Sequence, residues 1–562
     1  MLAILAAAAV LATPPSDSVH YSLSPVMRDG ALQALAVEIR LAGDADGETR
    51  LLLPDEWAGS DSLWQNISGL TVDGATAVRE EGGVSRILSH RPGAPLVVRY
   101  QVNSPYDEDP GFNYHKGLPV IRPGWFFFNG EGVFATPNGR MESPASFRWT
   151  GVPAAWKVAS DLDHLSSARP GTVNDIVQTT GIGAPDLAIA THPVGGALLR
   201  VAMRGQWEFT AEEFARSAAA IMNAENRMWG APGRPFLITL GALGGTGSGL
   251  SYMGTARGDA FAVASTPGFN LRDAARFLAH EYMHTWFAPA LGGSPDHEAS
   301  GFWFSEGFTE FYAARVLLRE GLWTPREYVD HLNSKLLRNA SSPVRGATLA
   351  QMEAGYWTDG NLQLLPYDRG HLGALVWDAR LRAATGGRVG VDEVIAEQYR
   401  TAARNGTGAG RVSAPELFVR TVREMAGVDL RDDIARMMER GEPIVLPADA
   451  FGACARVDTA SQPTFSRGFD ARATNAAGGV LAGVDSAGPA FAAGMRNGMR
   501  LIRREPGVFG DATVALAYRV ADESGERVIR YLPAGTGRVH LQRVTLTAEG
   551  ETPQCRRLMA GG

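Results

Sequence analysis

The chain has 562 residues, of which 45% are hydrophobic, 9% aromatic and 20% charged, and its formal net charge is −7. This ordinary globular composition excludes a disordered tail protein and a coiled-coil rod. The small acidic charge and the lack of a Lys/Arg-rich run exclude a typical nucleic-acid binder, so no nucleic-acid partner is expected. At roughly 100–200 residues per domain, the length predicts three or four domains.

The first residues, from Met1 to Ala12, form an apolar run that ends just before Thr13-Pro14-Pro15. A membrane span needs about 20 such residues, whereas the apolar part of a secretory signal has this shorter length. We therefore expect residues 1–18 to be a signal peptide and the protein to be exported, to the periplasm or beyond. An ordinary buried N-terminal segment is the alternative. No later apolar stretch approaches spanning length, so no integral membrane segment is expected.

Between residues 19 and 205, short apolar runs alternate with polar residues and are broken by Gly, Pro, Asn and Asp. The clearest runs lie at 34–41, 95–102 and 197–203. Such runs, without a long helical period, are typical of β-structure. We expect an N-terminal antiparallel β domain over residues 19–205.

Residues 234–240 have the pattern of a buried strand, and a glycine-rich loop follows at 241–249. The loop contains neither of the glycine-rich motifs that bind nucleotides, Gly-Lys-Ser/Thr and G-x-G-x-x-G. The sequence therefore argues against a nucleotide-binding loop. The loop also lacks G-x-S-x-G, so no serine-hydrolase nucleophile is indicated. We expect a flexible loop beside an active-site cleft.

Helical patterns dominate from residue 270 to about 441. Asn270 is a favourable N-cap for a helix over 271–287, and Thr324-Pro325 has the N-cap and N1 arrangement of another helix start. Further helices are expected at 304–321, 368–384, 391–404, 415–425 and 430–440. After a linker at 444–456, the chain returns to short strands with one small helix near 489–493.

A His-Glu-Tyr-Met-His motif occupies residues 280–284, on the first of these helices. Because four residues make just over one helical turn, His280 and His284 project from the same face. Two imidazoles so placed can share one tetrahedral zinc ion, and Glu281 beside them can reach a water on that metal. The alternative is a pair of structural or surface histidines without a metal. Three other histidines are expected to be structural or exposed: His297, His331 and His371.

A hydrolytic zinc site needs a third protein ligand and one open coordination position. The segment Trp-Phe-Ser-Glu-Gly-Phe-Thr-Glu follows at 303–310, at the start of the next predicted helix. Glu306 can complete a set of two histidines and one carboxylate. Glu310 lies one turn later and can accept a hydrogen bond from a ligand imidazole, which would fix the orientation of that ring. A solvated helix face is the alternative for Glu310.

HEYMH followed by SEGFTEF resembles the gluzincin metallopeptidases, in which a glutamate of an (N/S)EGF helix is the third metal ligand. The two motifs are most similar to the glycyl aminopeptidase family, M61, because His284-Thr-Trp286 matches the HExxHxW of that family. The resemblance implies a multidomain α+β fold, one Zn²⁺ per chain, and peptide or protein substrates. The implied parts are a β domain (19–205), a thermolysin-like, mostly helical catalytic domain (206–445) and a PDZ-like domain (455–562).

The same family places a tyrosine in a Y-x-K-G motif at the start of a later helix. Tyr367-Asp-Arg-Gly370 matches this motif, with Arg369 in place of the lysine. By this resemblance, Tyr367 donates its hydroxyl to the oxyanion of the tetrahedral intermediate, a role that suits a neutral phenol. A tyrosine packed in an interface is the alternative.

One departure from the family concerns the substrate-binding edge. Members that cleave from the N-terminus carry a glycine-rich segment of the type GGLEH, and the corresponding residues here are Gly249, Leu250 and Ser251. Ser251 replaces the glutamate that would bind a free α-amine, so peptide hydrolysis is better supported than aminopeptidase specificity. Arg257 can attract a substrate carboxylate or be an ordinary surface charge.

The C-terminal region contains Gly468-Phe469 and, later, a stretch at 485–502 that resembles PDZ domains of bacterial proteases, although Met499 stands where Asp is usual. Such a domain binds a peptide ligand by adding a strand to its sheet edge. A small β domain without a ligand is the alternative. Cys454 and Cys555 flank the region and can pair in an oxidising compartment, but the sequence does not establish their geometry.

The sequence thus predicts a zinc peptidase in which Glu281 takes a proton from the attacking water and passes it to the leaving amine. The preferred interpretation is an M61-type aminopeptidase. The first alternative is an endopeptidase with the same chemistry. The second is an exported, PDZ-type peptide-binding or chaperone-like protein whose metal site is vestigial.

Overall fold

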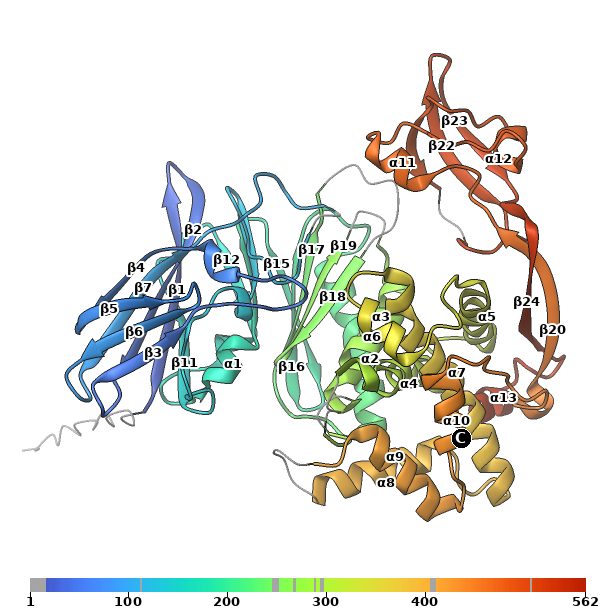
Figure 1. Cartoon of the computed structure of the whole chain (residues 1–562), viewed down its shortest axis with the longest axis horizontal. Coiled ribbons are helices and arrows are strands. Elements are labelled where there is room, and N and C mark those ends of the chain that lie inside the picture. Colours follow the sequence, from blue (N-terminus) through green and yellow to red (C-terminus); the bar gives the residue numbers. More distant parts are fainter. Residues whose placement is uncertain are drawn as a thin grey trace, which may run out of the picture. The chain divides into compact units, whose positions relative to one another are not determined.

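The computed structural model has a mixed α+β, multidomain fold (Figure 1). The described residues are 17–111, 114–244, 252–265, 269–287, 290–293, 298–404, 411–505 and 508–561. Unit 1 consists of Met1–Arg216, Gly233–Gly245 and Ser251–Phe269, and unit 2 of Ser217–Pro232, Thr246–Leu250 and Asn270–Gly562. Residues 1–16 of the expected signal peptide lie outside the described residues. Within the described ranges, every helix is too short or too polar to cross a bilayer.

Unit 1 is built almost entirely from strands. A six-stranded sheet has the order β13-β11-β1-β2-β7-β4, and two four-stranded sheets have the orders β10-β3-β6-β5 and β12-β14-β9-β8. The bounds are β1 (Val19–Arg28), β2 (Ala31–Ala42), β3 (Glu48–Leu52), β4 (Ile67–Asp73), β5 (Ala75–Glu81), β6 (Ser85–His90), β7 (Pro95–Val102), β8 (Val120–Arg122), β9 (Trp125–Asn129), β10 (Thr136–Pro137), β11 (Pro144–Trp149), β12 (Lys157–Ser160), β13 (Gly171–Thr172) and β14 (Thr180–Ala184), with one short helix, α1 (Val173–Val177).

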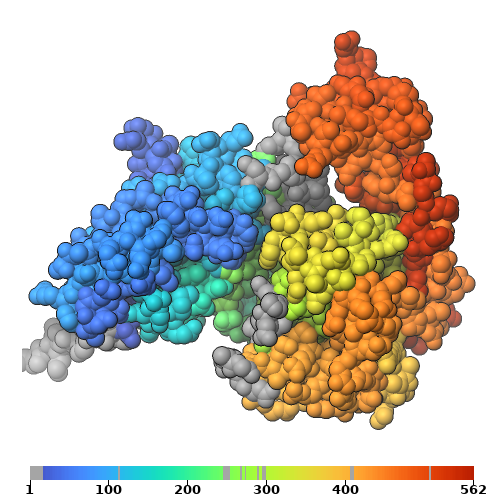
Figure 2. All heavy atoms as spheres, viewed as in Figure 1, coloured from blue at the N-terminus to red at the C-terminus, as the bar shows by residue number. Residues whose placement is uncertain are grey.

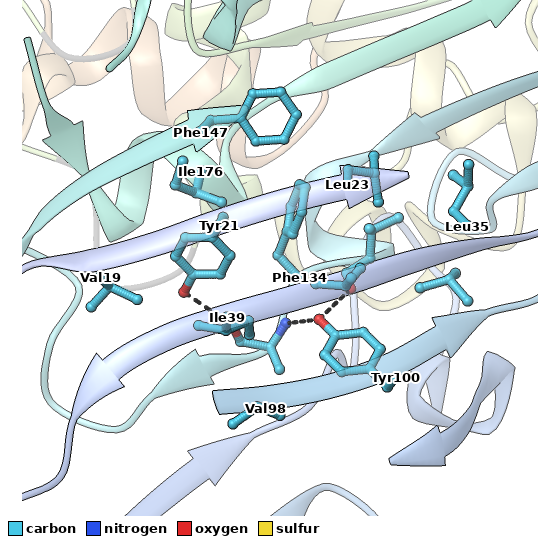
Figure 3. Close-up of a cluster of buried hydrophobic side chains, with 14 of the residues drawn as sticks. Val19, Tyr21, Leu23, Leu35, Ile39, Val98, Tyr100, Phe134, Phe147 and Ile176 are labelled. Atoms are coloured by element: carbon cyan, nitrogen blue, oxygen red, sulfur yellow. Dashed lines mark hydrogen bonds between the residues drawn. The ribbon is translucent and has the colours of Figure 1, made fainter. Parts of the chain in front are cut away.

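The core of these sheets follows from the alternation of apolar residues in the strands. In β7, Leu96, Val98, Tyr100 and Val102 are buried while the residues between them face outward, which is the period of two that a half-buried strand requires. Figure 3 shows this core, where the Tyr100 hydroxyl donates to the Val133 carbonyl at 2.9 Å. The predicted strands are confirmed, but the antiparallel pattern is incomplete because β1 pairs with β11 in parallel.

A five-stranded sheet of unit 1 has the order β15-β16-β17-β19-β18. Its strands are β15 (Ala188–Val194), β16 (Ala197–Arg204), β17 (Phe236–Ala242), β18 (Tyr252–Arg257) and β19 (Ala260–Ser265). The central strands β16, β17 and β19 run parallel, whereas β15 and β18 pair antiparallel at the two edges. The domain boundary that we expect at residue 205 falls within this sheet, since β16 precedes it and β17 follows it.

Unit 2 contains most of the helices. They are α2 (Ala211–Trp229, of which the residues from Ser217 belong to this unit), α3 (Leu271–Phe287), α4 (Phe302–Arg319), α5 (Pro325–Ser341), α6 (Leu349–Gly355), α7 (Gly360–Thr385), α8 (Val391–Arg404), α9 (Ala414–Ala426) and α10 (Arg431–Ile434), which a π-helical turn extends to Glu439. In the space-filling view, yellow and orange atoms of this unit form a closely packed surface (Figure 2).

Local signals account for most of these helices. The expected helices at 271–287 and 391–404 are confirmed as α3 and α8, and α5 begins at Pro325 behind a capping box formed by Thr324 and Glu327. The prediction that Tyr367 starts a helix is wrong. Helix α7 begins seven residues earlier, at Gly360, because the Asp359 side chain accepts a hydrogen bond from the backbone of Asn361, and Pro366 lies inside the helix.

Helices α4 and α7 pack closely where two glycines meet. A Cβ atom on Gly370 would lie 2.7 Å from the Cα atom of Gly307 and would also collide with the carbonyl oxygen of Trp303. Neither glycine can therefore carry a side chain without separating the helices. Glu306 immediately precedes the first glycine, and Tyr367 lies one turn before the second, so this crossing holds those two residues near each other.

Replacing Gly370 with alanine is therefore expected to lower the apparent melting temperature by several degrees, because overpacking costs about 1–3 kcal/mol. The matched control is Gly360→Ala in the same helix, where an added Cβ meets no atom within 4 Å. That substitution is expected to leave the melting temperature unchanged or slightly higher. Thermal unfolding monitored by circular dichroism measures both, and equal melting temperatures for the two variants would contradict the close crossing.

The chain beyond residue 445 returns to strands and ends on the helices of unit 2. Strands β20 (Ala455–Phe465) and β24 (Ala534–Leu546) form a long hairpin-like pair, and β21 (Arg500–Arg504), β22 (Leu516–Asp522) and β23 (Gly525–Tyr531) form a three-stranded sheet with α11 (Ala471–Ala476) and α12 (Pro489–Ala492) nearby. The last helix, α13 (Pro553–Met559), contacts α4 and α5. A disulfide joins Cys454 to Cys555, across 101 residues of sequence.

Candidate metal centre

The three residues predicted to bind a metal come together in unit 2. Helix α3 carries His280 and His284 one turn apart, and α4 carries Glu306 in its second turn. The Oε2 atom of Glu306 lies 3.2 Å from Nε2 of His280 and 3.4 Å from Nε2 of His284. The side chain of His280 is 6% exposed, that of His284 is 19% exposed and that of Glu306 is 17% exposed. The cluster is therefore largely shielded from solvent but still accessible.

These donor atoms fit a single tetrahedral divalent ion. Ligands at about 2.0–2.2 Å from a tetrahedral zinc ion place neighbouring donor atoms roughly 3.3–3.6 Å apart. The two measured separations match that edge length. In addition, Oε2 of Glu306 is buried and has no hydrogen-bond partner of good geometry, which is costly unless a cation satisfies it. Two imidazole nitrogens and one carboxylate oxygen also form the donor set of a catalytic zinc site with one open position.

In the metal-free chain, a proton takes the place of the cation. Burial alone would lower the pKa of His280, but the carboxylates of Glu306 and Glu310 overcome it and raise the pKa to about 10. Burial would conversely raise the pKa of Glu306, yet the two histidines hold that pKa well below its usual value. The metal-free cluster is therefore an imidazolium shared by carboxylates.

Metal binding at pH 8 is therefore expected to release about one proton from His280, because a metal ligand must be unprotonated. The apparent affinity for Zn²⁺ should increase as the pH rises toward about 10, and it should level off above that pH, where proton release from this residue disappears. Titration of Zn²⁺ into weakly buffered, metal-free protein with a pH indicator measures the stoichiometry. Metal binding at pH 8 without proton release would contradict the assignment of His280 as a ligand.

Glu310 lies behind the cluster and is buried rather than solvated. Its Oε1 atom is 3.1 Å from Nδ1 of His280, which is within the distance of an ion pair. The two groups are not well aligned for a hydrogen bond. The same oxygen accepts a hydrogen bond from Arg276 at 2.7 Å, and Oε2 is 2.7 Å from Nζ of Lys335. Burial opposes ionisation of Glu310, but these cations hold its pKa well below the usual value. Glu310 can thus orient the His280 ring.

Tyr367 contacts a residue of the cluster, and Glu281 lies beside the cluster on α3. The ring of Tyr367 stacks on that of His280, with centroids 5.7 Å apart. Burial raises the pKa of Tyr367 well above its usual value, and the negative charges of Glu306 and Glu281 add to this shift. The phenol therefore stays protonated and can donate a hydrogen bond. Glu281 is partly exposed on α3, next to His280.

Two basic residues that the sequence singled out have structural partners. Arg369, which stands at the lysine position of the family motif, donates to the carbonyl oxygens of Arg345 and Ala347 and anchors the loop before α6. Arg257, in unit 1, pairs with Glu131 and lies over the ring of Trp57 at 4.5 Å. Burial lowers the pKa of Arg257 to about 10. Because its charge is already paired, Arg257 is not available to attract a substrate carboxylate. Gly249, Leu250 and Ser251 lie outside the described residues.

The structure also brings residues to the cluster that sequence patterns missed. Glu225 of α2 is fully buried, neither of its carboxyl oxygens has a hydrogen-bond partner, and burial raises its pKa well above the usual value despite the nearby His280. Lys335 of α5 and Asp368 of α7 lie behind Glu310 and are equally buried. No sequence motif marks these three residues. The apolar period of α2 and of α5 could have placed Glu225 and Lys335 on the inner faces of their helices.

Comparisons with known proteins bear on the same region. Residues 273–364 match the family model described as M61 glycyl aminopeptidase. No curated protein sequence gives a significant match. Among solved structures, an aminopeptidase N family protein from Idiomarina loihiensis superposes with a TM-score of 0.67 and 15% identity, and the alignment covers 96% of this chain and 100% of that one. An M1 zinc metallopeptidase from Deinococcus radiodurans aligns at 16% identity with a TM-score of 0.48, over 77% of this chain and 95% of that one.

At 15% identity, the likeness to the Idiomarina protein concerns the fold, which it shares over nearly the whole chain. The family match is shorter but includes all three clustered donors, His280, His284 and Glu306. The fold, the matched segment and the convergence of the donors agree, and the protein is a hydrolase of the metallopeptidase class.

Proposed function

We propose that the protein is a zinc-dependent peptidase whose metal ligands are His280, His284 and Glu306. The observation that carries the proposal is the position of Nε2 of His280 and Nε2 of His284, 3.2 and 3.4 Å from the buried Oε2 atom of Glu306. That oxygen has no hydrogen-bond partner of good geometry, and all three donor atoms lie within 4.8 Å of one another. A set of two imidazoles and one carboxylate with an open position suits zinc, which has no geometric preference of its own and favours four ligands.

A zinc ion at this site would supply Lewis acidity, polarising the scissile carbonyl and making water more acidic. Glu281 takes a proton from the attacking water and delivers it to the amine that leaves. The Tyr367 hydroxyl donates a hydrogen bond to the carbonyl oxygen as negative charge develops on it, which is worth a few kcal/mol for one well-placed donor. Glu310 holds the His280 ring in the orientation that presents Nε2.

Within this class we propose an aminopeptidase of the M61 type. The description of the matching family supports it. The replacement of the family's glutamate by Ser251 leaves endopeptidase activity as the second candidate, because a free α-amine needs a negative partner in the site.

Peptides with a free N-terminus, beginning with glycine, alanine or a large residue, are expected to be cleaved at least tenfold faster than the same peptides with an acetylated N-terminus. The acetyl group removes the positive charge that an aminopeptidase recognises. Mass spectrometry of the products measures both the rate and the bond cleaved. Equal cleavage of blocked peptides at internal bonds would identify an endopeptidase, and a metal-free, inactive protein that still binds peptides would identify the non-catalytic alternative.

We further propose that the protein is exported and that residues 455–562 form a PDZ-like domain that binds a peptide. The disulfide between Cys454 and Cys555 supports export, because such bonds persist in oxidising compartments. The three-stranded sheet β21-β22-β23 has strand edges to which a peptide could add, which supports the second part.

A further inference from the structure

A buried ammonium group lies behind the candidate metal centre. Lys335 of α5 has a side chain that is 2% exposed, and its Nζ atom is 2.7 Å from Oε2 of Glu310 and 3.5 Å from Oδ1 of Asp368. The two carboxylates are 5% and 3% exposed. A charged lysine is rarely buried to this extent unless it is paired, and here a single cation bridges two acids from different helices.

Each of these acids leads to a residue of the proposed active site. On the α4 side, Glu310 contacts Nδ1 of His280. On the α7 side, Asp368 directly follows Tyr367 in the sequence. Lys335 thus connects a metal ligand to the helical turn that carries the proposed oxyanion donor, although it touches neither residue itself.

A second metal site is the competing explanation for this region. Glu310, His331 and His371 have potential ligand atoms that all lie within 4.8 Å of one another. However, the Lys335 ammonium already occupies Oε2 of Glu310, and Arg276 occupies Oε1. A divalent ion placed among these cations would be repelled, and both oxygens of the carboxylate already have cationic partners. Lys335 therefore provides the positive charge that a metal would otherwise supply.

We propose that Lys335 is a positioning residue that holds Glu310 against His280 and ties it to Asp368, the neighbour of Tyr367 on α7, so that the metal ligand and the oxyanion donor keep a fixed separation. The proposal rests on the proposed peptidase function. Without Lys335, Glu310 would keep its contact with His280 and the hydrogen bond from Arg276. Because the Arg276 side chain is 31% exposed, the carboxylate could turn toward solvent with it. Asp368 would still keep Arg338. Loss of Lys335 should therefore disturb the metal side more than the fold of α7.

The test compares Lys335→Met with a matched control, Arg315→Met. Arg315 is also a buried cation, 3% exposed. It lies on α4 and pairs with Asp378 of α7 at 2.6 Å and with Asp392 of α8 at 3.0 Å. It lies outside the Lys335 pairs. Both variants remove one buried cation that pairs with a carboxylate of α7, so a general loss of stability affects both. Only Lys335→Met removes the contact that leads to the metal ligand.

Three measurements are made on the full chain: Zn²⁺ affinity by competition with a chromophoric chelator, the visible spectrum of the Co²⁺-substituted protein, and kcat and KM for a peptide. Lys335→Met is expected to weaken Zn²⁺ binding about 10–100-fold, to change the Co²⁺ spectrum and to lower kcat at least tenfold with little change in KM. Arg315→Met is expected to stay within about threefold of the wild type in all of them. Wild-type metal binding in Lys335→Met, or equal losses in both variants, would overturn the proposal.

If Lys335→Met does not fold, two isosteric variants carry the same test. Glu310→Gln is expected to weaken Zn²⁺ binding and change the Co²⁺ spectrum, whereas Asp368→Asn is expected to lower kcat with the metal affinity unchanged. The reverse pattern, or no effect of either, would overturn the proposal. The affinity and the spectrum do not depend on turnover. A wild-type protein that binds Zn²⁺ but cleaves no peptide would therefore refute the proposed function and still leave Lys335 testable.

Discussion

Replacing Glu281 with glutamine is expected to lower kcat/KM by about 10³-fold while the protein keeps its full complement of zinc. Glutamine has nearly the same shape as glutamate but cannot take a proton from water, and general acid–base catalysis contributes about 10²–10⁴-fold. Because Glu281 is not one of the three clustered donors, metal binding should not change. Steady-state kinetics and metal analysis on the same preparation measure the two effects separately.

The matched control for this variant is Glu320→Gln. Glu320 caps the end of α4 and pairs with Arg227, away from the clustered donors. Exposed ion pairs contribute about 0–1 kcal/mol, so activity should remain near that of the wild type. If Glu281→Gln were as active as Glu320→Gln, Glu281 would not be the general base.

Replacing Glu306 with alanine is expected to abolish detectable activity, because the metal itself is lost. A structural zinc site binds with roughly 10–16 kcal/mol, so the removal of one of its ligands should weaken binding at least about 10²-fold. The substitution also removes one of the two carboxylates that raise the pKa of His280 by direct contact. The pKa of His280 should therefore fall below its present value of about 10. Metal binding by the variant should accordingly release less than one proton at pH 8.

The activity of Glu306→Ala should return only in part when excess Zn²⁺ is added, whereas chelator-treated wild-type protein should recover fully. Glu320→Ala, at the other end of the same helix, is expected to retain both metal and activity. A Glu306→Ala protein with wild-type zinc content and turnover would remove this residue from the ligand set.

The sequence could predict those features of the site that depend on neighbours along the chain. The four-residue spacing of His280 and His284 determines a shared helix face, and the boundaries of α3 follow from its N-cap and hydrophobic pattern. The capping box of Thr324 and Glu327 likewise marks the start of α5. By contrast, the helix expected at 368–384 begins eight residues earlier, at Gly360, because Asp359 caps it and Pro366 lies within the helix.

What the sequence could not predict depends on contacts between distant segments. Lys335 and Asp368 lie on different helices from Glu310, and each resembles an ordinary surface charge until α4, α5 and α7 pack together. The pairing of Cys454 with Cys555 depends in the same way on the return of α13 to the helices of unit 2. The strand order of the five-stranded sheet is also non-local, since β16 and β17 pair across the expected domain boundary.

The central claim is that His280, His284 and Glu306 bind one zinc ion. A crystal of the zinc-loaded protein, with diffraction data collected just above and below the zinc absorption edge, tests it most directly. We expect a single anomalous peak about 2.0–2.2 Å from Nε2 of both histidines and from a carboxylate oxygen of Glu306. A peak at another site, or none among these three residues at full zinc loading, would contradict the account.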